Sequence, residues 1–312
     1  ASLTEARYVI GIPTYRRPQG LETALTSVAR LASPSGIRVI VAENDAERRQ
    51  GEAVCRRMRA GGFPFPLDVV VAAERSISAA RNAIVECVLA TPSTELIAML
   101  DDDEWCEPDW LMQICQAQEA IDADIVGGPV QRVFEVDVPE HIRQANSIKS
   151  KANETRKIRS IESTGNIAFR AGILRKMPAA WFDPAFGLTG GSDRDLLLRL
   201  RLSGAVFAWA HKALLYEAFP ASRCTEEWTL QRAYRVGNSE MLADMKNRPP
   251  GYVLKEFSKI AWAFGDAVLA HLLPARSKEH RFRARQGFVR AWGKIDAVRG
   301  RRFVEYKNTH GA

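Results

Sequence analysis

The sequence predicts an α/β domain with a mostly parallel central sheet, followed by a helical extension. Short apolar runs alternate with segments of helical periodicity over residues 8–121, a pattern typical of βαβ units. Polar or acidic residues directly follow several of these runs, which is where open α/β sheets bind their ligands. From residue 246 onward the pattern is helical throughout.

Each expected element follows from the period of its apolar residues. In the first part of the chain, strands are expected at residues 8–12, 37–42, 68–72 and 96–100, and helices at 21–31, through Val54 and Met58, and at 76–89. In the second part, helices are expected at 110–121, 193–202 and 225–245, strands at 124–133, 164–169 and 205–210, and a mobile loop at 137–160. Two amphipathic helices, broken near Pro274, follow Tyr252.

Composition excludes several classes of protein. With 46% hydrophobic and 26% charged residues, the chain is expected to be globular. The five cysteines form no CxxC or CxxH group, so neither a disulfide framework nor a zinc site is predicted, and the cytoplasm is the expected compartment. No secretory signal is predicted, and the longest apolar run, 260–273, is interrupted by Asp266 and shorter than the ~20 residues of a membrane span.

An acidic cluster, Asp101 to Glu104, directly follows the apolar run 96–100. Carboxylates packed at the end of a strand repel one another unless a cation neutralises them. Mg²⁺ and Mn²⁺ prefer oxygen ligands and bind through one or two carboxylates together with water and substrate phosphates. The cluster therefore predicts a site for Mn²⁺ or Mg²⁺ that a diphosphate completes, although acidic runs are also typical of solvated loops.

Two further segments carry candidate site residues at helix starts. In TGGSDRD a glycine turn precedes a helix, where Asp193 is either a helix cap or a general base for an attacking hydroxyl. In ERSISAARN, Arg75, Ser78 and Arg81 lie where free backbone N–H groups can bind an anion. The alternative for these arginines is an ordinary position on the surface.

As an ordered series, these motifs resemble glycosyltransferase family 2 of the GT-A fold, and most of all its bacterial exopolysaccharide transferases of the succinoglycan type. The resemblance extends from Tyr8 to about Gly237 and rests on IPTYRRP, VAEND, SISAARN, LDDDEWCEPDWL, STGNIAFR and GGSDRDLLLRL. It implies a GT-A-like, Rossmann-type catalytic domain over residues 1–245, with a nucleotide-binding part over about 1–105 and an acceptor part over about 106–245. A basic amphipathic helical extension would occupy residues 246–312.

The resemblance also implies a role for each matching residue. A UDP-sugar donor would be bound by Pro13, Thr14, Tyr15, Arg17, Glu43, Asp45, Arg75, Ser78, Arg81, Asp101 and Asp102. Among these, Pro13, Thr14 and Glu43, or Asp45 in place of Glu43, would hold the uracil and ribose. Asp101 and Asp103 match the outer acids of the family's DxD motif and would hold Mn²⁺ or Mg²⁺, Asp103 being the better ligand. Asp193 matches the second acid of the family's Glu-Asp pair and would be the catalytic base. The acceptor would lie beside Gly190, Gly191, Ser192 and Trp181. Apart from the resemblance, Trp105, Trp181 and Trp228 are candidates to stack on a sugar ring, Trp181 being the best of them, and the alternative for each is packing in the core.

Two departures from the family pattern concern these residues. Glu43 stands where the family often has Asp, which bears on the contacts to base and ribose. Ser192 stands where the family usually has Glu, so the first acid of the Glu-Asp pair is missing. Asp195 and Glu162 are the candidates to replace it.

The predicted function is inverting, metal-dependent transfer of a sugar from a UDP-sugar to a hydroxyl of a polysaccharide or lipid-linked glycan. The QxxRW signature of processive synthases is absent, although Trp228 and Arg232 lie in the expected region, so addition of a single sugar is favoured. One alternative is a sugar-phosphate nucleotidyltransferase, which is disfavoured because Gly20 is the only glycine of the loop after the first strand. Another is a non-enzymatic carbohydrate- or nucleic-acid-binding module, which leaves the acidic cluster unexplained.

Positive charge is concentrated near the C-terminus. Residues 276–302 contain ten Lys or Arg against two acids, with Phe282, Phe288 and Trp292 interleaved among them. Such a basic amphipathic segment suits an anionic membrane surface, which would place the protein peripherally on the inner face of the cell membrane. The alternative is that the aromatic residues pack on the catalytic domain. No nucleic acid is expected as a partner.

Overall fold

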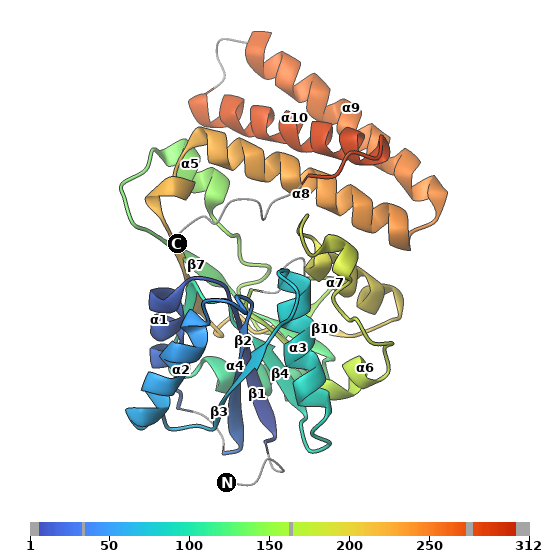
Figure 1. Cartoon of the computed structure of the whole chain (residues 1–312). Coiled ribbons are helices and arrows are strands. Elements are labelled where there is room, and N and C mark those ends of the chain that lie inside the picture. Colours follow the sequence, from blue (N-terminus) through green and yellow to red (C-terminus); the bar gives the residue numbers. More distant parts are fainter. Residues whose placement is uncertain (1–5, 33–34, 162–164, 273–276, 304–312) are drawn as a thin grey trace.

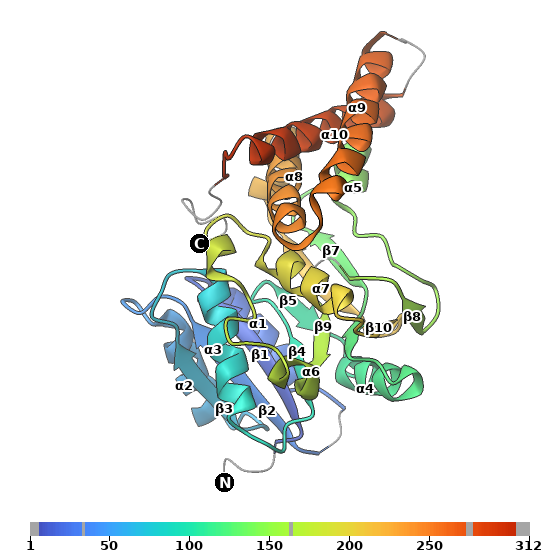
Figure 2. The same ribbon diagram turned by 90° about the vertical axis from the view of Figure 1, so that its right-hand side faces the viewer.

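The computed structural model describes residues 6–32, 35–161, 165–272 and 277–303. Figure 1 shows an α/β domain with a layer of long helices above it, and Figure 2 shows the same two regions after a quarter turn. Three positions named from the sequence lie outside the described residues: Glu162, Thr164 at the start of an expected strand, and Pro274 at the expected break between helices.

The central sheet is mostly parallel, as expected. In the described residues it consists of β1 (Tyr8–Thr14), β2 (Ile37–Glu43), β3 (Leu67–Val71), β4 (Leu96–Met99), β6 (Ile125–Gly127), β8 (Arg156–Ile158), β9 (Ile167–Arg170) and β10 (Phe207–Trp209). The strand order is β3-β2-β1-β4-β9-β6-β10-β8, in which β9 is antiparallel to both of its neighbours and β8 is antiparallel to β10. The carboxyl ends of β1, β2 and β4 therefore lie at the same edge.

Helices cover both faces of this sheet. One face packs on α1 (Pro18–Val28), α2 (Gln50–Ala60) and α4 (Trp110–Ile121), and the other on α3 (Ile77–Leu89), α6 (Ala171–Arg175) and α7 (Ser192–Leu202). Strand β2 shows why: Val39 and Val41 face the first core, whereas Ile40 and Ala42 face the second. A strand buried on both faces is apolar at nearly every position, and the apolar run from Val39 to Ala42 is how β2 was identified in the sequence.

The expected strand over residues 124–133 is wrong, because two strands of different sheets occupy this stretch. β6 belongs to the central sheet, whereas β7 (Val130–Phe134) belongs to a small sheet of order β5-β11-β7, with β5 (Glu104–Cys106) and β11 (Leu215–Phe219). Gly128 separates β6 from β7 where the backbone passes close to Ala213, since a Cβ there would overlap the carbonyl oxygen of Ala213.

The expected loop over residues 137–160 is also wrong in part, because it contains α5 (Glu140–Asn146) and β8. Helix α5 has too few residues to be stable by itself. It is held by contacts to other elements, since Nε2–H of His141 donates a hydrogen bond at 2.8 Å to the carboxylate of Glu226 and the His141 ring packs edge-on against Phe282. These partners are distant in the sequence, so the local pattern gave no sign of the helix.

The helical layer consists of α8 (Glu226–Asn247), α9 (Pro250–Leu272) and α10 (Lys278–Val298). Helix α8 lies in this layer, although it precedes the expected boundary at residue 245. Two glycines bring the backbones of α8 and α10 together. A Cβ at Gly237 would overlap the carbonyl oxygen of Arg290, and a Cβ at Gly293 would overlap that of Tyr234.

The aromatic residues of the basic segment mostly pack inside the molecule. Phe282 is buried against His141, Phe288 contacts Phe264 of α9 at 4.6 Å between ring centres, and Phe303 packs edge-on against Tyr234. Among the helices of the described residues, none has both the length and the apolar character needed to traverse a lipid bilayer.

Candidate active site

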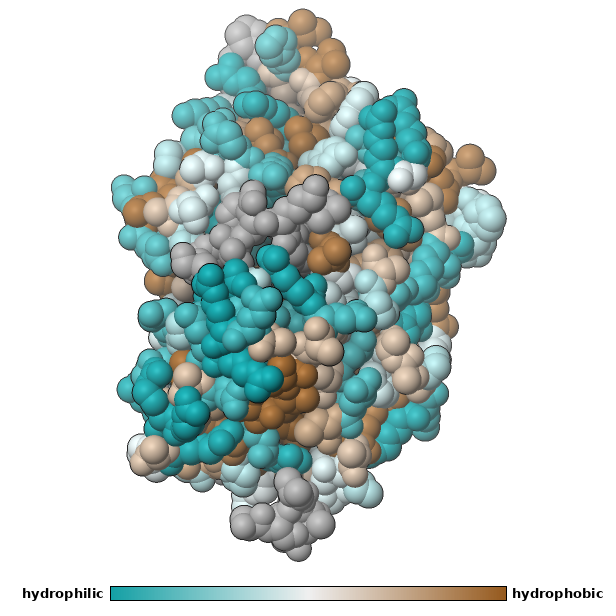
Figure 3. Space-filling view, in the orientation of Figure 1, coloured by the Kyte–Doolittle hydropathy of each residue, from teal (hydrophilic) through white to brown (hydrophobic). Residues whose placement is uncertain are grey.

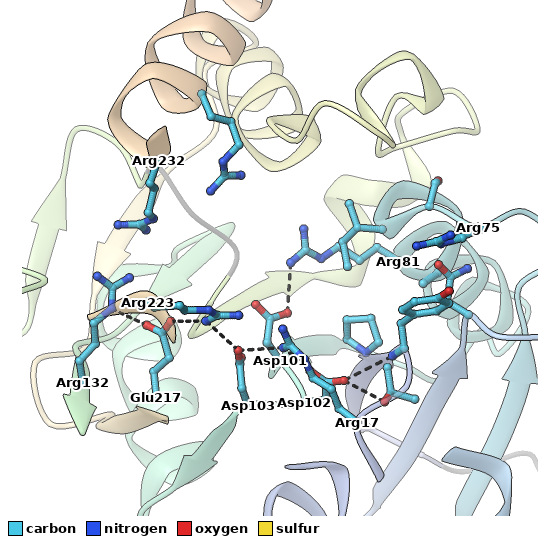
Figure 4. Close-up of a pocket in the computed structure, with 18 of the residues that line it drawn as sticks. Arg17, Arg75, Arg81, Asp101, Asp102, Asp103, Arg132, Glu217, Arg223 and Arg232 are labelled. Carbon is cyan, nitrogen blue, oxygen red and sulfur yellow. Dashed lines mark hydrogen bonds and ion pairs between the residues drawn. The ribbon is translucent and has the colours of Figure 1, made fainter. Parts of the chain in front are cut away.

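A cavity of about 290 Å³ lies where the carboxyl ends of β1 and β4 meet the start of α3 and the first half of α8. Figure 4 shows the side chains that point into it. Its lining comprises Pro13, Thr14, Tyr15, Arg17, Asn44, Arg75, Ser76, Ile77, Ala80, Arg81, Asp101, Asp102, Asp103, Arg132, Glu217, Arg223, Trp228, Arg232 and Arg235. Seven arginines face four carboxylates in this set, so the cavity favours an anionic ligand.

The loop after β4 is fixed by Asp102, which is almost fully buried. Its Oδ2 accepts a hydrogen bond from Thr14 Oγ1 at 2.9 Å, and its Oδ1 accepts one from Arg17 at 3.1 Å. Burial raises the pKa of Asp102 to about 7, with Asp103 acting in the same direction and Arg17 opposing it. Asp102 thereby joins the end of β1 to the end of β4 and holds the flanking aspartates in place.

Asp101 and Asp103 point into the cavity (Figure 4). Asp101 accepts a hydrogen bond from Arg81 at 3.1 Å. The Oδ2 atom of Asp103 accepts two, from Arg17 at 2.9 Å and from Arg223 at 3.2 Å. The two acids that match the DxD motif therefore share the cavity with arginines that neutralise them.

These two carboxylates suit Mg²⁺ or Mn²⁺ only in combination with a ligand. Within the described ranges, no group of three or more His, Cys, Asp or Glu side chains is arranged to hold a metal ion. Asp101 and Asp103 supply the one or two carboxylates that such an ion usually takes from a protein, and substrate phosphates and water supply the rest. The donor chemistry of the corner thus fits an ion that binds together with a diphosphate, not an all-protein cage.

Glu43, the last residue of β2, and Asp45 bond to neighbouring residues and do not line the cavity. Glu43 accepts backbone hydrogen bonds from Asp45 at 2.8 Å and Gly51 at 2.6 Å, which fixes the start of α2. Asp45 accepts a hydrogen bond from Arg16 at 2.5 Å. The neighbouring Asn44 lines the cavity instead.

The N-terminus of α3 faces the cavity, as the sequence predicted for a helix start. Ser76 caps the helix by accepting a hydrogen bond from the backbone of Ala79 at 3.0 Å. Arg75 lies over the ring of Tyr15, with 4.8 Å between its guanidinium carbon and the ring centre. Ser78, in contrast, is buried and donates a hydrogen bond to the carbonyl oxygen of Asp183, so it positions α3 without lining the cavity.

Asp193 lies in the first turn of α7, after Gly190 and Gly191, whose φ angles of 74° and 97° favour glycine. It is partly exposed, accepts a hydrogen bond from the backbone of Arg194, and is not among the residues that line the cavity. The glycine turn nevertheless adjoins the cavity wall, because a Cβ at Gly190 would lie 3.0 Å from Nη1 of Arg235. Ser192 is buried at the start of the same helix.

Two expectations on the acceptor side are not compatible with the structure. Trp181 is buried in the core and donates a hydrogen bond to the carbonyl oxygen of Leu174, so its ring has no free face for a sugar. Asp195 is fully buried and accepts hydrogen bonds from Arg199, Lys246 and Asn247, so it does not replace the missing acid of the Glu-Asp pair.

Ten lining residues were not predicted as site residues. Four of them, Asn44, Ser76, Ile77 and Ala80, are close in the sequence to predicted ones. The other six are Arg132, Glu217, Arg223, Trp228, Arg232 and Arg235. They come from β7, β11, η2 (Ala221–Arg223) and α8. A signal was present only for α8, where Trp228, Arg232 and Arg235 recur at helical spacing and therefore share one face.

Comparison with known proteins identifies the family. Residues 9–178, more than half of the chain, match the family described as Glycosyl transferase family 2. The chain belongs to glycosyl transferase family 2. It is a glycosyltransferase, so the nucleotidyltransferase and binding-module alternatives are set aside. The family resemblance read from the motifs is confirmed.

Relatives of this glycosyltransferase match nearly its whole length. It is 29% identical over 311 residues to the succinoglycan biosynthesis protein ExoM of Rhizobium meliloti (strain 1021), with 95% of this chain and 94% of the relative covered. The crystal structure of S. aureus TarS 1-349 in complex with UDP-GlcNAc has a TM-score of 0.50 at 14% identity, covering 94% of this chain and 92% of that one. A longer S. aureus TarS structure has a TM-score of 0.51 at 13% identity, covering 93% and 55%. The fold is therefore that of GT-A glycosyltransferases.

Proposed function

We propose that the protein transfers a sugar from a UDP-sugar to a hydroxyl of a glycan, with inversion at the anomeric carbon and dependence on Mn²⁺ or Mg²⁺. The observation that supports this best is the cavity at the carboxyl edge of the sheet, where two accessible carboxylates, several arginines and the start of α3 converge. A nucleoside diphosphate carries the negative charge that such a cavity favours. The UDP-GlcNAc complex of TarS, which shares the fold, supports the choice of donor.

The donor would lie between Tyr15 and the aspartates. Arg17 and Arg81 are placed to donate hydrogen bonds to its phosphates, since both already reach into the cavity toward carboxylates. When bound, Mn²⁺ or Mg²⁺ would be held by Asp103 and Asp101 and would stabilise negative charge on the leaving diphosphate. The arginines would then exchange their carboxylate partners for phosphate oxygens.

Asp193 would be the general base that takes the proton from the acceptor hydroxyl. Its carboxylate lies in the first turn of α7, directly after the glycine turn that adjoins the cavity wall. The hydroxyl would attack the anomeric carbon from the side opposite the diphosphate, so a single displacement would invert the configuration. The half-exposed position of Asp193 beside the glycine turn leaves room for an acceptor.

The donor proposal is tested by the thermal stability of the purified protein with UDP-, GDP- and dTDP-sugars, each with and without Mn²⁺. Binding raises the melting temperature by mass action, so a UDP-sugar with Mn²⁺ is expected to give the largest rise. The proposal fails if no nucleotide sugar stabilises the protein, or if the rise is equal without metal and for every base.

We also propose that the protein attaches peripherally to the inner face of the cell membrane, where anionic lipid is present. The attachment would use α9 and not the aromatic residues of α10. Exposed apolar side chains recur along the outer face of α9, namely Leu254, Phe257, Trp262, Val268, Leu269 and Leu272. Figure 3 shows hydrophobic residues along the upper edge of the molecule, where α9 lies. Exposed Lys255 and Lys259 flank this face, and the charge of the following segment suits anionic lipid.

A further inference from the structure

The cavity has a second basic wall that the donor does not account for. It is formed by Arg132 of β7, Arg223 of η2, and Arg232 and Arg235 of α8, which we name the α8-side arginines. In Figure 4, Arg132 and Arg232 lie on one side of the three aspartates and Arg75 lies on the other. Two groups of positive charge therefore flank the acidic corner.

The α8-side arginines outnumber the acids that face them. Glu217 accepts a hydrogen bond from Arg132 at 2.8 Å and lies 3.8 Å from Arg223, which also reaches Asp103. Arg232 has no carboxylate partner in the described part of the chain. Its guanidinium carbon lies 5.6 Å from the ring centre of Trp228.

This arrangement is electrostatically unfavourable without an anion. Burial lowers the pKa of Arg232, and the positive charges of Arg132 and Arg235 lower it further. A buried cation costs free energy unless an opposite charge compensates it, and several like charges around one space increase that cost. The fold maintains these arginines in the cavity wall, which is typical of a site that receives negative charge from a ligand.

The diphosphate of the donor has cationic partners of its own. Arg17 and Arg81 extend from the β1 loop and α3, on the side of the nucleotide-binding part. The α8-side arginines come instead from the acceptor part and the helical layer. They also adjoin the turn that precedes Asp193, since Gly190 approaches Arg235. The second group of positive charge thus lies on the side where the acceptor is expected.

Resting on the proposed function, we infer that the α8-side arginines form a subsite for a phosphate or diphosphate group of the acceptor, so that the acceptor is a phosphate-bearing glycan. A single carboxylate can pair with the two parallel N–H donors of one guanidinium group. A phosphate group has more oxygens and more negative charge, so it can bind several guanidinium groups at once. Trp228 lies beside Arg232 and offers an aromatic face to a sugar ring next to that phosphate.

The experiment measures binding of glucose 1-phosphate, as a probe, to the intact protein saturated with UDP and Mg²⁺. Isothermal titration is expected to show that glucose 1-phosphate binds under these conditions and that methyl glucoside and glucuronate bind at least about tenfold more weakly. Competition between UDP and glucose 1-phosphate for one site would overturn the inference, because the α8-side arginines would then belong to the donor.

Arg232→Gln is the decisive variant, with Arg281→Gln, an exposed arginine of α10, as its matched control. Arg232→Gln should weaken the binding of glucose 1-phosphate about tenfold or more and leave the affinity for UDP unchanged. The melting temperature should stay the same, since the substitution removes a charge that has no carboxylate partner. Arg232→Lys keeps the positive charge but not the planar pair of N–H donors, so its affinity for glucose 1-phosphate should lie between those of the wild type and Arg232→Gln. Equal weakening of UDP and glucose 1-phosphate by Arg232→Gln would contradict the inference.

The two proposals fail in different ways. If the wild-type protein does not bind UDP, the proposed function fails. Glucose 1-phosphate is then titrated into the protein without UDP, and the Arg232→Gln variant still decides whether the α8-side arginines bind phosphate. If UDP binds but glucose 1-phosphate does not, only the acceptor subsite is refuted.

Discussion

Asp103 occupies a position in which its partners must change during the proposed reaction cycle. Without ligand, one carboxylate oxygen accepts hydrogen bonds from both Arg17 and Arg223. These two arginines come from opposite sides of the cavity, so Asp103 separates the donor half from the acceptor half. A change at this residue is therefore expected to affect both ligands and not the fold.

Asp103→Asn should weaken binding of UDP in the presence of Mn²⁺ by about tenfold or more, because a neutral amide is a poor ligand for the ion. The measurement is isothermal titration of UDP with Mn²⁺ and with EDTA. Asp122→Asn, an exposed acid on the C-terminal side of α4, is the control. Wild-type affinity of Asp103→Asn with Mn²⁺ would remove Asp103 from the metal site.

Asp193→Asn should retain the affinity for the UDP-sugar and lose transfer by about 10²–10⁴-fold, the range typical of a general base. Transfer is measured as release of UDP in the presence of acceptor, and donor binding is measured separately by thermal shift. Asp183→Asn, whose carboxylate pairs with Lys246 away from the cavity, should keep near-normal turnover. Turnover of Asp193→Asn above a tenth of the wild-type value would exclude it as the base.

At the residue level, the sequence indicated the acids of one strand end but not the arginines that face them. Asp101 and Asp103 were predictable because consecutive residues after a buried strand must appear at its carboxyl end. Arg223 was not, because it reaches Asp103 from 120 positions away in the chain. The side chains of Glu43 and Asp45 turned toward the local backbone and Arg16, a choice that a polar cluster in a sequence does not reveal.

Helix α9 is joined to α10 by one buried acid. Burial opposes the charge of Glu256, but hydrogen bonds from Lys259 and Lys294 lower its pKa to about 2, below its ordinary value of 4.5. Glu256 therefore contributes stability that is fully present above pH 4.5 and is lost as the pH falls toward 2.

Glu256→Gln should lower the free energy of unfolding at pH 7 by about 1–3 kcal/mol, since Lys259 loses its carboxylate partner and Lys294 keeps only the more distant Glu240, at 3.9 Å. The difference from wild type should shrink as the pH falls from 4.5 toward 2. Urea denaturation at pH 7 and pH 3 measures both values, with exposed Glu86→Gln as the control. A difference that does not depend on pH would show that the charge of Glu256 is not responsible.

At the level of elements, the sequence predicted best where burial is continuous. Strands β1, β2 and β4 were found because apolar residues fill most positions of these strands, which are buried on both faces. Strand β7 was merged with β6, although Gly128 and Pro129 between them are a turn signal in the sequence. Strand β5 lies within the acidic motif itself, where Glu104 and Cys106 are buried and the strand pairs with β11 of the small sheet.

The molecule as a whole combines a site at one edge of the sheet with an exposed apolar helix beyond it. Trp262 on α9 is 73% exposed and Leu254 is 71% exposed. Exposed side chains of this size on one helical face are uncommon unless a partner or a membrane covers them.

Trp262→Glu combined with Leu269→Glu should reduce cosedimentation with liposomes that contain anionic lipid at least about fivefold, without changing the melting temperature. The control is Trp228→Phe, which changes an aromatic residue of the cavity and not of the surface. Liposomes of neutral lipid should retain less of the wild-type protein than anionic ones. Unchanged sedimentation of the double variant would refute attachment to the membrane through α9.

The order of elements up to β4 and the position of the acidic corner could be predicted, because alternating strands and helices restrict the topology. The use of α8 as a wall of the cavity could not. The sequence of a helix shows which of its faces is apolar, but not which neighbour that face contacts. Here α10 packs against one side of α8, whereas Trp228 and Arg232 of α8 line the cavity.

The close approach of Gly237 to Arg290, repeated between Gly293 and Tyr234, packs the backbones of α8 and α10 directly against each other. Any displacement of α8 is therefore transmitted to α10, and through Phe288 and Phe264 to α9. An acceptor that draws Arg232 inward would shift the outermost helix by the same rigid linkage. Docking of that helix on a bilayer would in turn fix the height at which the reacting hydroxyl meets the sugar.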